Sequence, residues 1–346
     1  MKNSARAVPA VLALCVSLLA ACSGSGSPKA EPSQTASPTP SATVAPTPTV
    51  APAALNPLTG KPAGVGQQVI AVKIDNTRPA HPQQGVEDAD IVYLEEVEGG
   101  LSRLCAVFSS TLPRKLGPVR SVRETDLELL APYGKLAFAF SGGNKGVLRK
   151  VRASTVVDVS VDRVPSKYYR VFGGRHAPYN LFTNPASLLA ARPSSARVKD
   201  VGFRFGPAGT GSQPATSFSV SFLRAKVGVT WSAAQSRWLI AMDGHPDLAV
   251  GGARLGADNV IVQFVKIDRS RFSDVNGVTS PITRTIGTGR AMYFRDGTLT
   301  AGTWSRKGSN ATRWVDANGA PFLLKPGKTW VILVRQGTNV PVNAAF

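Results

Sequence analysis

The chain has 346 residues, a formal net charge of +19 and 43% hydrophobic residues, with 33 Gly and 26 Pro. This length suits one large or two medium domains. The charge includes Lys2 and Arg6 of an N-terminal signal segment, and the remaining +17 favours anionic surroundings, although a solvated basic surface has the same composition. Because the signal places the chain outside the cytoplasm, nucleic acid is excluded as a partner.

The N-terminus has the pattern of a bacterial lipoprotein signal. Lys2 and Arg6 precede an apolar run from Val8 to Leu19 and the string LAAC at 19–22. The run is short for a lasting membrane span, which disfavours the alternative of an uncleaved anchor. We predict a signal peptide at 1–21 and acylation of Cys22 with diacylglycerol and palmitate. The lipid on Cys22 would hold the protein on the outer face of the cell membrane.

Residues 22–55 form a tether between the lipid and the folded body. The segment is rich in Ser, Pro, Thr and Ala and nearly uncharged, so it cannot bury a core. Of the three cysteines, Cys15 leaves with the signal and Cys22 is acylated, which excludes an intramolecular disulfide. Cys105 lies in the apolar run LCAVF and is predicted to be buried rather than nucleophilic.

Residues 56–205 alternate strand and helix patterns, which predicts an α/β domain with a mixed sheet and helices. Strands are expected at 69–74, 89–97, 101–109, 136–140 and 155–161, with a hairpin turn at 98–100. A capping-box pattern from Ser121 to Glu124 predicts a helix over 126–131 that ends near Pro132. Two further helices are expected at 147–151 and 185–191, the second capped by Asn184.

Residues 206–217 are rich in Gly and Pro and are predicted to be a linker. Helical patterns are not found after it. Strands are expected at 218–222, 227–231, 238–242, 259–267, 286–294, 298–305 and 329–334, separated by turn pairs such as Asp243-Gly244. This pattern predicts a mainly β C-terminal domain at 218–346, folded as a small barrel or sandwich.

The segment GPVRSVR at 117–123 is the best candidate for a ligand site. A helix N-terminus carries unpaired N–H groups and a partial positive charge, and here Ser121 begins it with Arg120 and Arg123 alongside. This arrangement predicts a cradle for phosphate or carboxylate. An ordinary capped helix whose arginines pair with nearby acids would have the same sequence.

Acidic residues are unusually dense at positions 75, 88, 90, 95, 96 and 98. Strand alternation puts Glu95 and Glu98 on opposite faces, so not all of these acids meet. Asp75 and Glu98 are expected near Arg103 and the arginines of GPVRSVR. Such a group is either a catalytic or metal-binding set that includes Asp90, or a network of ion pairs. The network is favoured, because catalysis needs separations and pKa shifts that a sequence does not show.

Other catalytic patterns are weak. The histidines at 81, 176 and 245 are far apart and lack metal-ligand spacing, and no G-x-S-x-G, S-x-x-K or P-loop motif is present. No cofactor is therefore expected, apart from a divalent metal if the protein is an enzyme, and no residue is assigned as a metal ligand.

The strings IAVKIDN, ADIVYLEEVEGGLSR, GPVRSVR and PYNLFT, followed by GHPD and KPGKTW, resemble the YerB-like family of bacterial lipoproteins. The resemblance implies a lipoprotein with N- and C-terminal domains of unknown function, and no established activity. Two departures are His81-Pro82-Gln83, where the family tends to have Arg-Pro-Gln, and Leu94, where it tends to have Glu. A role that rests on that Glu is in doubt here. The motif positions are Asp75, Asn76, Asp90, Glu98, Arg103, Arg120, Arg123 and Asn180.

Together these patterns predict an anchored lipoprotein that binds an anionic envelope ligand without catalysis. The ligand would be a wall polymer, a lipid-linked phosphate or an acidic glycan, and the β domain would dock a protein partner. The alternative is a metal-assisted enzyme that transfers phosphoryl or glycopolymer groups, with Asp75, Asp90 and Glu98 as metal ligands or general acid and base. The expected ligand-binding residues are Asn76, Arg103, Arg120, Ser121, Arg123 and Asn180.

Overall fold

The computed structural model describes residues 54–63, 68–193, 198–209 and 211–344. The predicted signal peptide, Cys22 and the tether up to residue 53 lie outside these residues. All described elements belong to one compact unit that runs from Pro52 to Phe346. Because this unit contains both hydrophobic cores, a chain that begins at Pro52 keeps every described element and is expected to fold on its own.

The first part of the unit mixes strands and helices. The α-helices are α1 (Glu124–Leu130), α2 (Lys145–Ala153) and α3 (Pro185–Ala191). The 3-10 turns are η1 (Arg78–Ala80), η2 (Val86–Asp88), η3 (Glu98–Gly100), η4 (Ala131–Tyr133) and η5 (Pro165–Lys167). The strands are β1 (Ile70–Asp75), β2 (Ile91–Glu96), β3 (Ser102–Phe108), β4 (Ala137–Ala139), β5 (Val157–Asp158), β6 (Tyr168–Arg170), β7 (Leu181–Thr183) and β8 (Arg204–Phe205).

The second part is built from strands, and no helix is found in its described residues. Its strands are β9 (Gln213–Pro214), β10 (Ser217–Ser221), β11 (Lys226–Ser232), β12 (Arg237–Met242), β13 (His245–Pro246), β14 (Gly256–Ala257), β15 (Asn259–Ser273), β16 (Thr279–Arg284), β17 (Gly287–Arg295), β18 (Thr298–Arg306), β19 (Arg313–Asp316), β20 (Leu323–Leu324), β21 (Thr329–Arg335) and β22 (Val342–Asn343).

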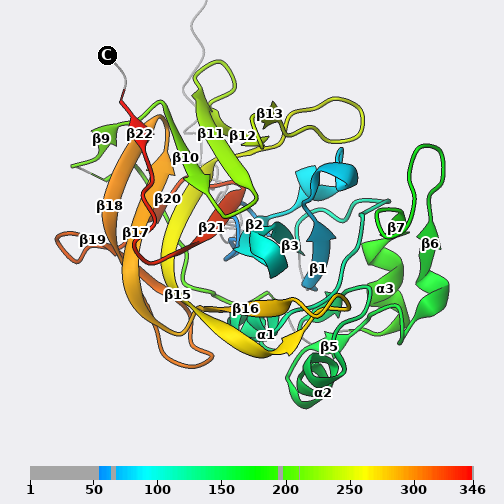
Figure 1. The fold of residues 1–346 in the computed structure, drawn as a ribbon. Helices are drawn as coiled ribbons and strands as arrows, with labels where there is room; N and C mark the ends of the chain where they lie inside the picture. Colours follow the sequence, from blue (N-terminus) through cyan, green and yellow to red (C-terminus); the bar gives the residue numbers. More distant parts are fainter. Residues whose placement is uncertain (1–53, 64–67, 194–197, 210, 345–346) are drawn as a thin grey trace, which may run out of the picture. The chain divides into compact units, whose positions relative to one another are not determined.

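Strands of both parts form one continuous mixed sheet (Figure 1). Within the described residues its order is β19-β18-β17-β15-β21-β2-β3-β1-β4-β5, with β16 attached to β15 and β9 attached to β18. The junction is β21, which pairs in parallel with β15 on one side and with β2 on the other. A strand from near the end of the chain therefore completes the sheet of the first part.

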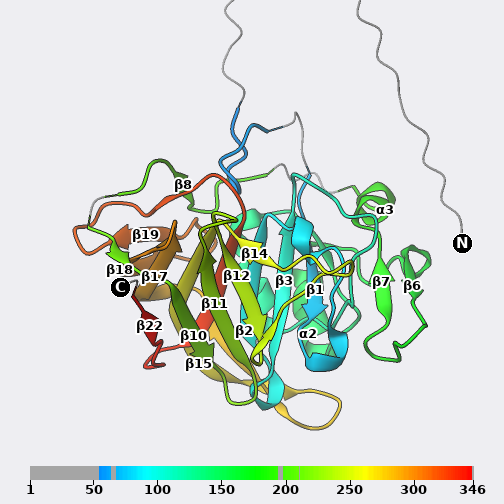
Figure 2. The same cartoon turned by 90° about the horizontal axis from the view of Figure 1, so that it is seen from above.

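Each face of the large sheet has its own hydrophobic core, because successive side chains point to opposite faces. On one face, Ile74 and Leu94 belong to a core shared with a six-stranded sheet, which contributes Trp238. On the other face, Tyr93 belongs to a core shared with α1 and α2. Figure 2 looks onto the six-stranded sheet, with β10, β11 and β12 in front of the large sheet.

The structure confirms a mixed sheet with helices followed by a mainly β part. No closed barrel is found among the described residues. The cap of α3 is as predicted, since Asn184 Oδ1 accepts from the N–H of Ala186 at 2.9 Å. Cys105 is buried, also as predicted.

The start of α1 corrects the sequence analysis. The helix begins at Glu124, and Ser121 does not cap it, because Arg123, in an extended conformation, is the N-cap residue. The N–H of Arg123 instead donates to Asp126 Oδ2 at 2.7 Å. An acid of the chain itself therefore occupies the first turn of this short helix, where the sequence predicted a cradle for an external anion.

Candidate functional site

Four segments that are far apart in the sequence meet at the end of β1. Main-chain hydrogen bonds join Asp75 N to Pro118 O at 3.0 Å and Val119 N to Leu181 O at 2.8 Å. A further bond joins Val250 N to Gln83 O at 3.0 Å. The strings IAVKIDN, GPVRSVR, PYNLFT and GHPD are thereby brought to one side of the molecule.

The arginine cluster consists of Arg103, Arg120, Arg123, Asp75 and Glu98. Arg103 lies directly opposite Asp75 in the pairing of β3 with β1. Arg120 Nε forms an ion pair with Asp75. Arg123 contacts both oxygens of Glu98, with Nη2 at 2.7 Å from Oε2. These are the ion pairs that the sequence favoured.

Glu98 is held as a carboxylate by its neighbours. Burial raises the pKa of Glu98, but the hydrogen bonds and charge of Arg123 outweigh burial and lower that pKa to about 2. Ser280 of β16 also donates to Glu98 through its hydroxyl group. The second part of the chain thus helps to hold an acid of the first part.

Arg103 lacks the acidic partner that its neighbours have. The residue is 8% exposed, and a guanidinium carries five N–H donors. Among the described residues its side chain makes one hydrogen bond, from Nη1 to Ser121 O at 3.3 Å, and no carboxylate lies within ion-pair distance. Burial and the charges of Arg123 and Arg120 lower the pKa of Arg103 to about 10. The charges of Glu98 and Asp75 act to raise this pKa, but neither carboxylate bonds to Arg103. A buried guanidinium with unfilled donors is costly, so this position favours a negative group from outside the chain.

The lysine triad, Lys73 with Glu95 and Asp126, lies on the same face of the sheet. All three side chains are fully buried, and Lys73 Nζ contacts Glu95 and, at 2.7 Å, Asp126 Oδ1. Burial lowers the pKa of Lys73, but Asp126 and Glu95 outweigh it and raise that pKa. Burial and the charge of Asp126 raise the pKa of Glu95 to about 7. The sequence analysis missed Lys73, although strand alternation places it on the same face as Asp75.

Three of the predicted site residues, Asn76, Asp90 and Asn180, are not part of the arginine cluster. β1 and β2 run in the same direction, because both pair antiparallel with β3. Asp75 ends β1 whereas Asp90 precedes β2, so the two acids lie at opposite ends of the sheet. Asp90 Oδ2 instead accepts from the N–H of Ser109 at 2.6 Å. Asn180 Oδ1 accepts from Arg170 at 2.9 Å.

Ser121 contributes its main-chain oxygen to Arg103, not its hydroxyl group. The carboxylates of the metal-assisted alternative do not converge, since Asp90 is remote from Asp75. Within the part of the chain that the structure describes, no group of three or more His, Cys, Asp or Glu is placed to hold a metal ion.

The seam network, Asn76, His81, Gln83 and Asp247, lies on the opposite face at the end of β1. Gln83 Nε2 donates to Asn76 Oδ1 at 2.9 Å. His81 Nδ1 lies 3.0 Å from Asp247 Oδ1, and its Nε2 lies 3.4 Å from Asn76 O. Both partners are acceptors, so the form of the ring with a proton on each nitrogen satisfies both contacts. Burial lowers the pKa of His81, but the hydrogen bond with Asp247 outweighs it and raises that pKa.

Comparisons with known proteins identify the family. The N-terminal domain described as "Protein of unknown function (DUF3048)" matches residues 58–199, and its C-terminal domain matches residues 218–331. The chain belongs to the DUF3048 family. Within the described residues of this DUF3048 protein, no helix has the length and apolar character needed to cross a membrane.

The YerB protein of Bacillus subtilis is similar to this chain both in sequence and in structure. A protein of strain 168 described as "Putative lipoprotein YerB" is 34% identical over 84 residues. That match spans 24% of this chain and only 25% of the relative. The crystal structure of the YerB protein has a TM-score of 0.70 at 19% identity and covers 83% of this chain and 99% of that chain. The structural likeness shows a shared fold.

Proposed function

We propose that this DUF3048 protein is an extracytoplasmic lipoprotein, anchored through Cys22, that binds an anionic envelope ligand without catalysis. The observation that carries the proposal is Arg103, a buried guanidinium with one hydrogen bond and no acidic partner among the described residues. The description of a relative as a putative lipoprotein supports the anchor.

The arginine cluster suits one anionic group of a larger ligand. The side chain of Arg120 is 19% exposed, and its guanidinium lies 5.7 Å from the ring centre of Tyr179. Arg120 is therefore a member of the arginine cluster that is partly open to solvent. A wall polymer, a lipid-linked phosphate and an acidic glycan all carry phosphate or carboxylate, which arginine binds with charge-assisted hydrogen bonds. The proposal includes a protein partner for the β part and no nucleic acid.

The test measures binding of inorganic phosphate to the chain from Pro52 to Phe346 by isothermal titration calorimetry. Loss of a charge-assisted hydrogen bond costs about 1.5–3 kcal/mol, so Arg103→Gln is expected to weaken phosphate binding roughly tenfold or more. Arg149→Gln, on the exposed face of α2, is the matched control. If both variants bind phosphate alike, the arginine cluster is not the anion site. Circular dichroism checks the fold, and Arg103→Lys is expected to keep part of the affinity.

The metal-assisted alternative now rests on Asp75 and Glu98, both of which are ion-paired. Magnesium separates the two functions in the same titration. Under our proposal the phosphate affinity is the same with and without magnesium. A strict magnesium requirement, together with hydrolysis of a phosphoester by the wild-type chain, would favour the enzyme.

The anchor has its own test. Cys22→Ser removes the acylated thiol, and with it the acyl chains that hold the protein in the bilayer. The variant is expected to move from the membrane fraction to the soluble extracytoplasmic fraction. A variant that stays in the membrane fraction would show that the lipid on Cys22 is not the anchor.

A further inference from the structure

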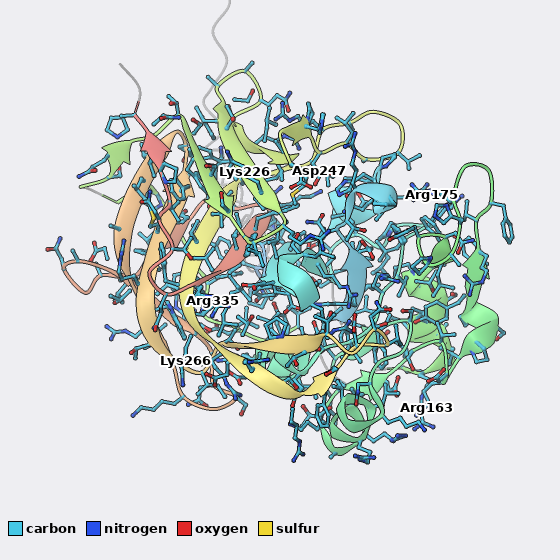
Figure 3. All side chains as sticks on the ribbon, viewed as in Figure 1. Arg163, Arg175, Lys226, Asp247, Lys266 and Arg335 are labelled. Atoms are coloured by element: carbon cyan, nitrogen blue, oxygen red, sulfur yellow. The ribbon has the colours of Figure 1, made fainter. Side chains whose placement is uncertain are left out.

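A cavity of about 400 Å³ lies between the η1 turn and the loop that follows β12, and we call it the seam cavity. Its walls are mainly apolar and include Met242, Pro246 and Leu248 from the second part and Pro82 from the first. Figure 3 shows Asp247 and Arg175 on either side of the η1 turn. The volume lies in the range of pockets that enclose small organic ligands, roughly 300–1,000 Å³.

The two sides of the seam cavity are tied together before any ligand binds. Val250 N donates to Gln83 O at 3.0 Å, and His81 is joined to Asp247 at 3.0 Å. These bonds connect the turn of the first part with the loop of the second part. A preformed cavity costs a ligand little ordering free energy.

Arginines dominate the charged groups around the seam cavity. Arg78 lines it and has no acidic partner among the described residues. Arg175 lies beside it, where Nη1 donates to Ala80 O at 3.2 Å and Nη2 to Pro82 O. The described part of the chain places no carboxylate within ion-pair distance of Arg175. His81 also lines the cavity, and Asp247 lies within ion-pair distance of its ring.

One acid, Asp243, also lines the seam cavity, and its Oδ1 accepts the N–H of Lys226 at 2.8 Å. Arg78 at the wall and Arg175 beside it carry two positive charges against this one lining carboxylate, so the charge complements an anion. From the apolar walls and the arginine rim, we infer that the seam cavity binds a small organic anion with an apolar body. The apolar body packs on Met242 and Leu248, and the anionic group faces Arg78. This site is separate from the arginine cluster and does not rest on the proposed function.

The experiment compares two fluorescent probes that share one ring system. 1-Anilinonaphthalene-8-sulfonate carries a sulfonate, and N-phenyl-1-naphthylamine does not. In fluorescence titrations of the chain from Pro52 to Phe346, the sulfonate probe is expected to bind about one molecule per chain and at least tenfold more tightly than the neutral probe.

Substitutions at two exposed positions test the contacts of the anionic group and of the apolar body separately. Arg78→Ala is expected to weaken the sulfonate probe about tenfold and the neutral probe less than twofold. Leu248→Asp places an acid in the apolar wall and is expected to weaken both probes. Arg152→Ala, on the exposed face of α2, removes the same charge elsewhere and is expected to change neither affinity.

Three results would overturn the inference. One is equal affinity of the wild-type chain for the two probes, since a neutral apolar ligand would then serve as well. Another is an Arg78→Ala affinity for the sulfonate probe that matches that of Arg152→Ala. The third is unchanged binding of both probes by Leu248→Asp. Phosphate titration of Arg78→Ala distinguishes the seam cavity from the arginine cluster. The phosphate affinity of this variant is expected to equal that of the wild type, whichever of the probe results is found.

Discussion

At the end of β1, the two faces of the large sheet bury polar groups with different kinds of partner. On the face covered by α1, Asp75 belongs to the arginine cluster, and the lysine triad lies beside it. On the face covered by the six-stranded sheet, Asn76 uses amide and imidazole partners, with a single buried ion pair at its rim. Asp75 at the end of β1 and Asn76 directly after it thus lie in two different electrostatic environments.

The two faces differ in how their positive and negative charges are balanced. In the lysine triad two carboxylates surround one cation, and in the arginine cluster three guanidinium groups share two carboxylates. The ionic face therefore holds a local excess of each sign side by side, whereas the seam network is close to neutral. Changes to the ionic face should alter stability more, and should depend more on pH, than changes to the seam network.

The largest effect is expected from Lys73→Met. It leaves Glu95 and Asp126 buried without their cation, which costs about 3–5 kcal/mol. The measurement is the free energy of unfolding in urea. The triple variant Lys73→Met, Glu95→Gln, Asp126→Asn should recover most of the loss, and Lys226→Met on the exposed surface should change stability by less than about 0.5 kcal/mol. A small loss in Lys73→Met would mean that the triad contributes little to the ionic face.

Glu95→Gln tests the pH dependence of that face. Between pH 4.5 and about 7 the native state binds more protons at Glu95 than the unfolded chain, so stability falls as pH rises through this window. Through Glu95, the free energy of unfolding of the wild type should fall by on the order of 1–3 kcal/mol between pH 5 and pH 8. Gln cannot titrate, so the variant should not show this fall. Unfolding in urea at four pH values measures it. Glu96→Gln, on the other face of β2, should keep the wild-type slope, and an unchanged slope in Glu95→Gln would contradict the assignment.

Gln83→Ala perturbs the neutral face. The change leaves Asn76 Oδ1 without its buried donor, which costs about 1–3 kcal/mol. The loss should be independent of pH between 5 and 8, in contrast to the ionic face. Urea unfolding of the same series measures it, with the exposed Gln235→Ala as control. A loss larger than that of Lys73→Met would reverse the ranking of the two faces.

The smallest effect is expected from His81→Arg. The folded pKa of His81 is raised, so its contribution is fully present below the unfolded pKa of about 6.5 and is lost as pH rises through the folded pKa. A guanidinium stays charged, so the variant should match the wild type within about 0.5 kcal/mol at pH 6 and be more stable at pH 8. Thermal unfolding at both pH values detects the difference. If the wild type and His81→Arg lose the same stability between pH 6 and pH 8, the charge of His81 does not stabilise the seam network.

Local patterns predicted much of the fold. Alternation located β18 within one residue of its observed end at Arg306, and Asn184 capped α3 as expected. The pairing of Asp75 and Glu98 with nearby arginines also followed from strand ends and loops. Local patterns failed where Ser121 resembled a helix cap, because the carboxylate of Asp126 makes the better-placed hydrogen bond.

Contacts between distant segments could not be predicted from one sequence. His81 and Asp247 are separated by 166 positions, and no periodicity of either segment indicates the other. The parallel pairing of β2 with β21 has no turn signal, since only adjacent strands share a hairpin. Among the described residues Arg103 has no ion-pair partner. This too is a property of packing, because it depends on which acids the other arginines bind.

The central place of β21 has a consequence for how the protein is made. Synthesis delivers Thr329–Arg335 after β2 and β15, so until then β2 and β15 each present an unpaired edge. Such edges can associate with other chains, and the nascent protein must be kept apart from them until β21 emerges. A premature stop after residue 325 would remove the middle of the sheet, although every strand from β1 to β20 would still be made. Loss of β22 alone would trim one edge strand and leave the rest in place.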